Sequence, residues 1–438
     1  MAHAAMFKSG PGPALTGLRV YIESYGCAMN MADGSLMAEL LAEAGHTIVG
    51  RPEEADVIIL NTCTVRSDTE RRMVKRIREL LSYGKKLVVA GCLASAQPGL
   101  VYKISRSISL LSARAVEAVR EVVEADGTVY VLEPRERKRL PRLLNGVTIT
   151  IPIAEGCLGS CAYCIVRAAR GPLRSYRPEA IVRAVEEAVS RGAREIRLTA
   201  QDTGVYGLDI GTNLAELLGA ICDIEGCFMV RVGMMNPNAA LRILDDLLEA
   251  YEDPKIYKFL HLPVQTGDDR LLKAMRRGYT VQDFLAVVEA FRRRFPDLCL
   301  ATDIMVGLPG EDEDAFRNTL DLLRRVRPDK IHVARYTPRP HTKAASMPGQ
   351  VPEPVKKERS RSVSALTLSI GLEKNRAYIG RRLACLVVGR GRRNGQLEAR
   401  TESYRPVYFI GPEALLGDFV GIEITGAGPF YLMGRLCY

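Results

Sequence analysis

Short apolar runs alternate with amphipathic stretches through the first part of the chain, residues 17–132. The runs with the length of buried strands are 18–26, 55–62 and 85–91, and the stretches with helical periodicity are 31–45 and 67–81. This alternation is typical of a parallel sheet covered by helices. The polar stretch that follows, 133–146, is rich in Pro and Arg and is predicted to be a linker.

The same alternation continues through residues 147–370, in six strand–helix units. The predicted strands are 147–154, 194–200, 227–234, 258–264, 298–307 and 330–337, with clear helical patterns at 177–192 and 314–326. Six consecutive units predict a partial (β/α)6 barrel, whose functional residues would gather at the carboxyl ends of the strands. A flat, doubly wound sheet fits the periodicity almost as well.

The last part, residues 375–438, loses the helical period. Five strand patterns broken by glycine replace it, at 381–391, 395–403, 405–411, 417–428 and 430–438. Such a pattern predicts a small β-barrel. The sequence therefore predicts an α/β protein of three units: an N-terminal parallel α/β domain, a central partial barrel and a small C-terminal β-barrel.

The distribution of charge along the chain indicates a binding partner. The formal net charge is +10, and the stretch from Lys356 to Arg400 holds 12 Lys and Arg against 3 Asp and Glu, a local excess of +9. A basic stretch beside a small barrel favours a polyanionic partner such as nucleic acid. A solvated, arginine-rich surface, common in heat-adapted proteins, is the alternative reading.

Composition also indicates a compartment. The first 17 residues contain no apolar run long enough for a signal peptide, and no stretch approaches the roughly 20 apolar residues of a membrane span. These features predict a cytoplasmic protein without a membrane anchor. Eleven cysteines in a reducing compartment favour metal binding or catalysis over a disulfide framework.

Cys157, Cys161 and Cys164 form a C-x3-C-x2-C motif directly after the first predicted barrel strand. Thiolates prefer zinc, Cu(I) or iron–sulfur clusters. A zinc site normally adds a second pair of ligands nearby, but the next Cys is Cys222 and the next His is His261. Three cysteines on one loop can hold three irons of a cubane cluster and leave the fourth iron open. Clustering by chance is the competing interpretation.

Cys27, Cys63 and Cys92 are dispersed, but each follows a predicted parallel strand of the first domain. Parallel strands of one sheet end at the same edge, so residues just past their ends can converge. Each cysteine by itself would more often be a buried core residue than a ligand. Together they predict a second site with three thiolates.

The C-x3-C-x2-C motif with an aromatic residue, Tyr163, before its last cysteine resembles the signature of the radical S-adenosylmethionine superfamily. The resemblance implies that Cys157, Cys161 and Cys164 hold a 4Fe–4S cluster, whose open iron binds S-adenosylmethionine, and that Tyr163 flanks the adenine. In this superfamily an electron from the cluster cleaves the sulfonium and yields a 5′-deoxyadenosyl radical. The protein holds, orients and shields the cofactor.

From about residue 18 to 438 the chain is similar to the methylthiotransferases of this superfamily. The likeness rests on the order of the three units, the last of which is a TRAM barrel in that family, and on four motifs: EGCLGSCAYCIVRAARG, LTAQDTGVYG, HLPVQTGDDRLLKAMRRGYT and ATDIMVGLPGE. It implies that Cys27, Cys63 and Cys92 hold a second 4Fe–4S cluster, whose open iron carries the sulfur of the methylthio group. One S-adenosylmethionine would donate the methyl group and another would supply the radical.

Three branches of the family differ in substrate: isopentenyladenosine in tRNA, an aspartate of a ribosomal protein, and N6-threonylcarbamoyladenosine at tRNA position 37. The stretches LTAQDTGVYGLDIGTNLAELL and MNPNAALRILDDLL are most similar to the archaeal and eukaryotic form of the third branch. The basic stretch beside the small barrel also suits tRNA phosphate better than a basic ribosomal protein. The sequence thus favours threonylcarbamoyladenosine in tRNA, with the other two substrates as alternatives.

Resemblance extends to further residues. Gln201, Asp202, Gln265 and Asp303 stand where the superfamily contacts S-adenosylmethionine, and Arg381, Arg382, Arg392 and Arg393 are the candidate tRNA contacts in the small barrel. Other residues have more than one interpretation each. Asn30 and Asn61 would hydrogen-bond cluster sulfurs or only shape turns. Three arginines would face RNA, a cofactor carboxylate or solvent: Arg170, Arg174 and Arg177. Lys356 and Lys357 would face RNA or be solvated helix charges.

A methylthiotransferase would need tRNA, an electron donor of the reductase, ferredoxin or flavodoxin type, and a source of sulfur. A non-catalytic iron–sulfur protein for RNA binding or electron transfer is the hypothesis from a different class. Release of 5′-deoxyadenosine would distinguish the two.

Overall fold

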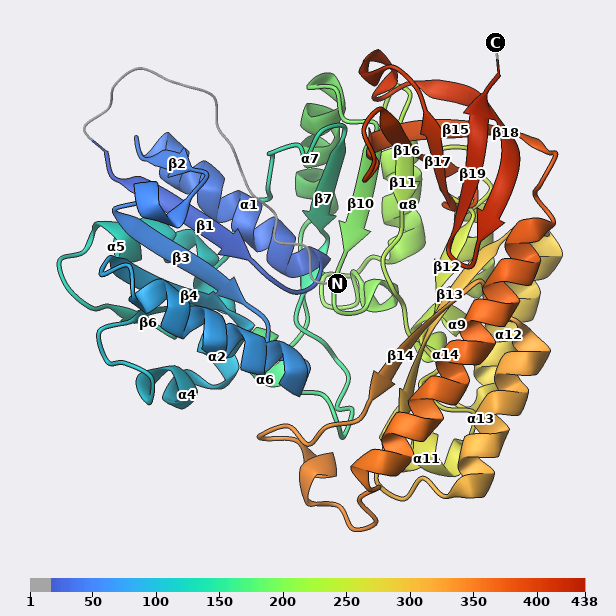
Figure 1. Ribbon diagram of the computed structural model, residues 1–438, viewed down its shortest axis with the longest axis horizontal. Coiled ribbons are helices and arrows are strands. Elements are labelled where there is room, and N and C mark those ends of the chain that lie inside the picture. The colour runs from blue at the N-terminus through green and yellow to red at the C-terminus, as the bar shows by residue number, and fades with distance from the viewer. Residues whose placement is uncertain (1–16, 438) are drawn as a thin grey trace.

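The computed structural model describes residues 17–437, which form three units in chain order (Figure 1). Residues 1–16, where no signal peptide is predicted, and Tyr438, at the end of the last predicted strand pattern, lie outside this description. No helix within residues 17–437 combines the length and the apolar character that crossing a membrane requires.

The N-terminal unit is a six-stranded parallel sheet with helices on both faces. Its strand order is β2-β1-β3-β4-β5-β6. The strands are β1 (Arg19–Ser24), β2 (Thr47–Val49), β3 (Val57–Thr62), β4 (Lys86–Gly91), β5 (Ser109–Ser112) and β6 (Tyr130–Val131). The helices are α1 (Ala28–Glu43), α2 (Ser67–Leu81), α3 (Cys92–Ala96), α4 (Pro98–Tyr102) and α5 (Val119–Glu124). Val20 packs with α1 and α5 while Tyr21 packs with α2 and α4, because successive strand residues face opposite sides. The predicted parallel α/β domain is confirmed.

The central unit is a partial barrel of six parallel strands in chain order. The strands are β7 (Thr148–Pro152), β10 (Glu195–Thr199), β11 (Met229–Arg231), β12 (Phe259–His261), β13 (Cys299–Val306) and β14 (Lys330–Arg335). They pair as β7-β10-β11 and β12-β13-β14, and a parallel bridge from Val230 to Ile256 joins the two halves. Among the described strands β14 does not pair with β7, so the barrel is open on that side. A doubly wound sheet would reverse its strand order midway, so the barrel interpretation is confirmed.

Helices cover the outside of this barrel. They are α7 (Pro178–Ser190), α8 (Leu214–Cys222), α9 (Pro237–Leu241), α10 (Leu244–Ala250), α11 (Asp269–Ala274), α12 (Val281–Arg294) and α13 (Glu313–Val326). The predicted helices at 177–192 and 314–326 correspond to α7 and α13. Between β7 and α7 the chain forms the short strands β8 (Ala154–Glu155) and β9 (Arg174–Ser175) and the one-turn helix α6 (Val166–Arg170).

A long helix, α14 (Glu353–Arg376), leads into a closed five-stranded barrel of order β15-β16-β17-β19-β18. Its strands are β15 (Arg382–Arg390), β16 (Gln396–Thr401), β17 (Pro406–Ile410), β18 (Phe419–Gly428) and β19 (Tyr431–Leu436). Leu386 and Val388 share an apolar cluster with Phe259 and Cys299. The C-terminal barrel therefore packs at the amino ends of the central strands, as Figure 1 also shows.

The predicted linker, 133–146, runs in mostly irregular backbone between β6 and β7, but it is not solvated throughout. The Arg137 side chain is 5% exposed and pairs with Asp33 of α1 and Glu155 of β8. Leu140 is buried in the core of the central unit. The stretch therefore fastens the first two units together.

Candidate active site

Cys27, Cys63 and Cys92 meet at the carboxyl edge of the N-terminal sheet. They follow β1, β3 and β4, which are neighbours in that sheet. The Cys27 and Cys92 sulfurs lie 3.8 and 3.6 Å from Oδ1 of Asn30. The geometry brings three dispersed cysteines to one place, as their positions in the sequence predict.

Asn30 also ties together the loops that carry these cysteines. Its Nδ2 donates to the carbonyl oxygens of Tyr25 at 2.9 Å and Thr62 at 2.8 Å, and Nδ2 of Asn61 donates to the Asn30 carbonyl at 2.7 Å. Gly26 has φ +121°, and a Cβ there would lie 2.9 Å from the Cys63 Cβ, so this turn requires glycine. Asn30 therefore shapes the turns, one of its two predicted roles, and Asn61 supports them; the Oδ1 of Asn30 that lies beside Cys27 and Cys92 can only accept a hydrogen bond.

Arg170 reaches this site from the central unit. Its side chain is 1% exposed, and Nη2 donates to Oδ1 of Asn30 at 2.8 Å and to Oδ2 of Asp33 at 2.6 Å. The expectation that Arg170 faces RNA, a cofactor carboxylate or solvent is wrong. Its guanidinium is instead a buried cation beside three thiols, and Arg137 pairs with the same Asp33.

Cys157, Cys161 and Cys164 lie on the loop between β8 and α6. The backbone N–H of Gly159 donates to the Cys157 sulfur at 3.2 Å, and a Cβ at position 159 would lie 3.6 Å from the Cys161 sulfur. Nη1 of Arg277 donates to the Cys161 sulfur at 3.1 Å. The loop thus wraps around its own sulfurs and receives a cation from the segment after α11.

A hydrogen-bonded chain supports Cys161 through Arg277. Arg277 is buried, and its guanidinium also donates to Oδ1 of Asn236 and to Oη of Tyr279. Nδ2 of Asn236 donates to Oδ2 of Asp202 at 2.6 Å. Sequence reasoning missed Arg277 and Asn236. Both belong to stretches that carry the family likeness, but no local pattern pairs an arginine with a cysteine 116 positions away.

We expect Arg277→Lys to slow the release of 5′-deoxyadenosine by about 10- to 100-fold, because partners that orient a metal ligand typically have effects of that size. A lysine ammonium cannot reach Cys161, Asn236 and Tyr279 at once as the planar guanidinium does. Turnover of reconstituted protein, followed by chromatography, measures the change. The neighbouring Arg276 is exposed, so Arg276→Lys is the control. Equal rates in both variants would contradict the role of Arg277.

The two cysteine triplets adjoin. Cys92 begins α3 and packs with Ile165 and Ala169 of the α6 region in one apolar cluster. Ile165 directly follows Cys164 in the chain. The N-terminal sulfurs and the loop sulfurs therefore flank the same contact between the first two units.

The donor set suits a group larger than one ion. Burial, with a smaller effect of the neighbouring Cys92, raises the pKa of Cys63 to about 12, and burial raises that of Cys164 to about 11, so loading a metal must release these protons. Within residues 17–437, the three sulfurs of neither triplet lie within 4.8 Å of one another. A tetrahedral zinc with bonds of about 2.3 Å needs sulfurs roughly 3.8 Å apart. Neither triplet is therefore arranged as three ligands of one tetrahedral zinc ion.

All three units of the chain are similar to known proteins. The chain matches the models of uncharacterized protein family UPF0004 over residues 19–128, the radical SAM superfamily over 151–323 and the TRAM domain over 376–437. A probable threonylcarbamoyladenosine tRNA methylthiotransferase from Pyrococcus horikoshii is 47% identical over 428 residues, which cover 96% of this chain and 99% of that one. The chain belongs to the radical S-adenosylmethionine methylthiotransferases. Membership of this superfamily implies a 4Fe–4S cluster and S-adenosylmethionine.

The chain is also similar to a second curated relative and, in fold, to a solved structure. A tRNA-2-methylthio-N(6)-dimethylallyladenosine synthase from Moorella thermoacetica is 38% identical over 441 residues, covering 95% of this chain and 97% of that one. The solved structure of a radical S-adenosylmethionine methyltransferase from Kitasatospora setae aligns with a TM-score of 0.53 at 16% identity, over 75% of this chain and 77% of that one. At that identity the likeness concerns the fold alone.

Two of the residues expected to contact S-adenosylmethionine, Tyr163 and Asp202, lie in or beside the Cys157–Cys164 loop of this methylthiotransferase. Tyr163 packs against Met275 and Tyr336, and Asp202 joins the hydrogen-bonded chain behind Cys161. Oε1 of Gln201 is buried and has no hydrogen-bond partner in the described residues. Gln265 follows β12 with φ +72°, and its backbone N–H donates to the Asp303 carbonyl at 2.8 Å.

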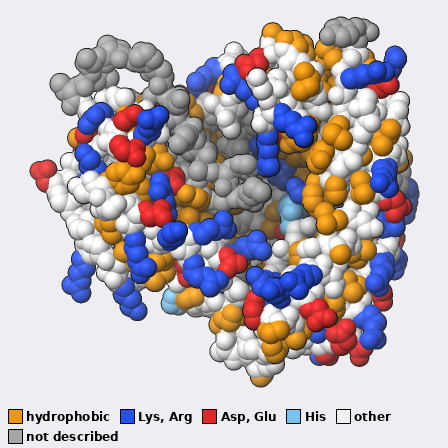
Figure 2. All heavy atoms as spheres, in the orientation of Figure 1, with side chains coloured by type: hydrophobic (Ala, Val, Ile, Leu, Met, Phe, Trp, Pro, Cys, Tyr) orange, Lys and Arg blue, Asp and Glu red, His pale blue; other side chains and the backbone are white. Residues whose placement is uncertain are grey.

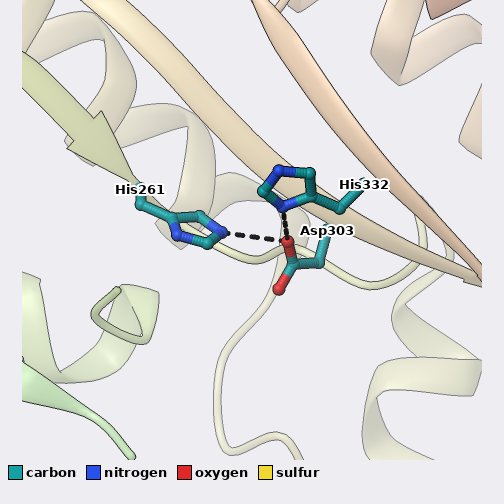
Figure 3. A group of neighbouring side chains, drawn as sticks. All are labelled: His261, Asp303 and His332. Atoms are coloured by element: carbon teal, nitrogen blue, oxygen red, sulfur yellow. Dashed lines mark hydrogen bonds and ion pairs between the residues drawn. The ribbon is translucent and has the colours of Figure 1, made fainter. Parts of the chain in front are cut away.

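Asp303 lies in the middle of β13, on the inner face of the barrel (Figure 3). Its Oδ1 is hydrogen-bonded to Nε2 of His261 and to Nδ1 of His332, both at 2.9 Å. Burial by itself would raise the pKa of Asp303, but the two imidazoles hold it well below its usual range. These three side chains are close enough to ligate one metal ion. The positive charges of Arg231 and Lys330 act on the same group and disfavour a cation there.

The candidate RNA contacts Arg381, Arg382, Arg392 and Arg393 are all exposed, but they do not form one patch. The first two stand at the start of β15, and the other two follow its end. β15 has nine residues, and at a rise of about 3.3 Å per residue this length places the two pairs of arginines roughly 25–30 Å apart. Arg381 also pairs with Asp297 of the central unit at 3.3 Å.

Part of the local +9 charge is neutralised inside the protein. Lys356 is buried and donates to the Tyr336 carbonyl at 3.0 Å, so its interpretation as an RNA contact or solvated charge is wrong. Arg359 pairs with Glu311 at 2.7 Å, whereas Lys357 is exposed. Figure 2 shows Lys and Arg side chains on both halves of this face, mixed with Asp and Glu. The positive surface is therefore spread over several units.

Proposed function

We propose that this methylthiotransferase converts N6-threonylcarbamoyladenosine at tRNA position 37 to its 2-methylthio derivative. The observation that carries the proposal is the adjacency of the two cysteine triplets, through Cys92 and Ile165. Methylthio transfer needs a radical source and a sulfur carrier at one adenine, and two neighbouring sites meet that need. The name of the Pyrococcus horikoshii relative supports the substrate.

In this proposal Cys157, Cys161 and Cys164 hold the cluster that binds S-adenosylmethionine, and Cys27, Cys63 and Cys92 hold a second 4Fe–4S cluster. When bound, these groups supply the radical chemistry and the transferred sulfur. The chain's own residues surround the sulfurs: Arg277 donates to the Cys161 sulfur, Oδ1 of Asn30 lies beside the Cys27 and Cys92 sulfurs, and the charge of Arg170, which donates to that oxygen, acts on Cys92. A cation beside a thiolate stabilises its charged, metal-binding form.

Tyr163, Gln201, Asp202, Gln265 and Asp303 are the proposed contacts of S-adenosylmethionine. The buried, unpartnered Oε1 of Gln201 suits a donor on the cofactor. Asp303 would use Oδ2, because its Oδ1 accepts from His261 and His332. The proposal includes Arg381, Arg382, Arg392 and Arg393 as tRNA contacts, an electron donor and a sulfur source as partners, and a cytoplasmic location.

The test is turnover of the anaerobically reconstituted chain with S-adenosylmethionine, a reductant and tRNA that carries threonylcarbamoyladenosine. Mass spectrometry of the nucleosides is expected to show the 2-methylthio product, together with 5′-deoxyadenosine and S-adenosylhomocysteine. Release of neither small product would instead favour a non-catalytic iron–sulfur protein.

A second candidate is 2-methylthiolation of isopentenyladenosine, because the Moorella thermoacetica relative that is 38% identical acts on a dimethylallyl base by its name. Parallel incubations with tRNA carrying that base, and with a ribosomal protein as the aspartate substrate, address both alternatives. Modification of either substrate while threonylcarbamoyladenosine stays unchanged would overturn the proposed substrate.

A further inference from the structure

A cavity of about 270 Å³ lies between the amino ends of the central strands and the C-terminal barrel. The central unit contributes Arg231, Phe259, Lys330 and His332 to its lining, and the C-terminal barrel contributes Tyr404 and Phe430. His332 is also hydrogen-bonded to Asp303 (Figure 3). The cavity therefore borders the middle of β13 and β14, where Asp303 and His332 lie side by side.

Two cations of this lining form no direct ion pair with a carboxylate in the part of the chain that the structure describes, and the nearby charge of Asp303 acts on Lys330 without contacting it. Arg231 forms no ion pair there, and its buried Nε has no hydrogen-bond partner. Its guanidinium lies 5.1 Å from the centre of the Phe259 ring and 5.9 Å from that of Tyr404. Lys330, the first residue of β14, also forms no ion pair within residues 17–437.

The other two arginines of the cavity lining do form ion pairs. Arg400 pairs with Glu398, and Arg405 pairs with Asp329. The half-buried charge of Arg231, which has no direct partner, is costly to the folded protein unless a ligand supplies the anion, whereas Lys330 is exposed. Cations next to aromatic rings suit an anionic group that is carried on a partly apolar body.

The substrate proposed above carries such a group. Threonylcarbamoyladenosine ends in a free carboxylate, which hangs from N6, and the bond from the ring to N6 diverges from the bond at C2, the carbon that receives the methylthio group. If C2 faces the cysteine triplets at the carboxyl ends of the strands, the N6 substituent extends toward their amino ends. We infer that Arg231 and Lys330 form a subsite for the threonyl carboxylate, an inference that rests on the proposed function.

This subsite discriminates between the two tRNA substrates by charge. An isopentenyl group is neutral and apolar, so it would leave Arg231 and Lys330 without a partner. A carboxylate pairs with both, and a site built around a charged group rejects an analogue that lacks it. The protein would then recognise the base by its N6 substituent and not at C2, where the methylthio group is added.

The test is binding of anticodon stem-loops that carry either threonylcarbamoyladenosine or plain adenosine at position 37, measured by fluorescence anisotropy with the reconstituted full chain. Arg231→Met and Lys330→Gln are each expected to weaken binding of the modified loop by roughly 10- to 100-fold, the size of a charge-assisted pair. Binding of the plain loop should change less than about twofold, because it carries no carboxylate.

Lys330 is exposed at the start of β14, so we expect Lys330→Gln to fold. This variant still tests the carboxylate subsite if Arg231→Met fails to fold. Lys357→Gln, an exposed lysine on α14, is the matched control. Equal losses on both loops would assign the two cations to backbone phosphate and overturn the inference. Variants that bind and modify the substrate as the unaltered chain does would also overturn it, while the proposed function would stand. An unaltered chain that fails to modify the base would count against the function itself.

Discussion

Cys92→Ala is expected to remove one of two clusters and to stop methylthio transfer while radical formation continues. The reconstituted chain should hold about eight irons and the variant about four, since each 4Fe–4S cluster depends on its thiolate ligands. Release of 5′-deoxyadenosine should stay within about twofold, whereas the 2-methylthio product should fall by more than about 100-fold. Iron and sulfide analysis, together with mass spectrometry of the nucleosides, measures both effects.

Cys161→Ala should give the reverse pattern, with about four irons and neither 5′-deoxyadenosine nor modified base. Cys227 is exposed and belongs to neither triplet, so Cys227→Ala is the control and should retain about eight irons. Full iron content in Cys92→Ala would show that the N-terminal triplet holds no cluster. Loss of 5′-deoxyadenosine in that variant would show that the two sites are not separable.

Arg170→Met is expected to have the next largest effect, although Arg170 is not a cysteine and belongs to the other unit. The substitution leaves Asp33 and Asn30 buried with fewer donors, and breaking such a network costs about 3–5 kcal/mol. Arg137 still pairs with Asp33, so we expect the lower end of that range. The variant should lose up to half of its iron and unfold at a lower temperature than the unaltered chain.

Arg174→Met provides the comparison, because Arg174 is exposed four residues further on. Arg170→Lys keeps the charge but not the paired donors, so it should fall between the two. The iron content after gel filtration separates a specific role from general instability. An Arg170→Met variant that melts early but retains all of its iron would reduce the role of Arg170 to packing.

The fold and the grouping of the cysteines could be predicted from the sequence because their signals are local or repetitive. Each strand of the central barrel is a short apolar run, and the C-x3-C-x2-C motif lies within eight positions. Cys27, Cys63 and Cys92 could be grouped because a parallel sheet brings the ends of neighbouring strands to one edge. That argument needs only the strand boundaries and no side-chain contact.

The supporting residues could not be found in this way. Arg170 contacts Asn30, 140 positions away, and Arg277 contacts Cys161, 116 positions away. Arginine is common in this chain, and its periodicity does not distinguish a buried guanidinium from a solvated one. Lys356 shows the same difficulty, since it occupies a helix rich in charge and yet is buried. Such positions depend on how complete units pack together.

During synthesis the N-terminal sheet leaves the ribosome before α6 exists. Its three cysteines can then come together, but Asn30 and Asp33 still lack Arg170, and Cys92 still lacks its cover of Ile165 and Ala169. We therefore expect stable insertion of iron and sulfide at the N-terminal cysteines to wait until the central unit has folded against them. Maturation would follow a fixed order, and a prematurely terminated chain would not retain an oxygen-sensitive cluster.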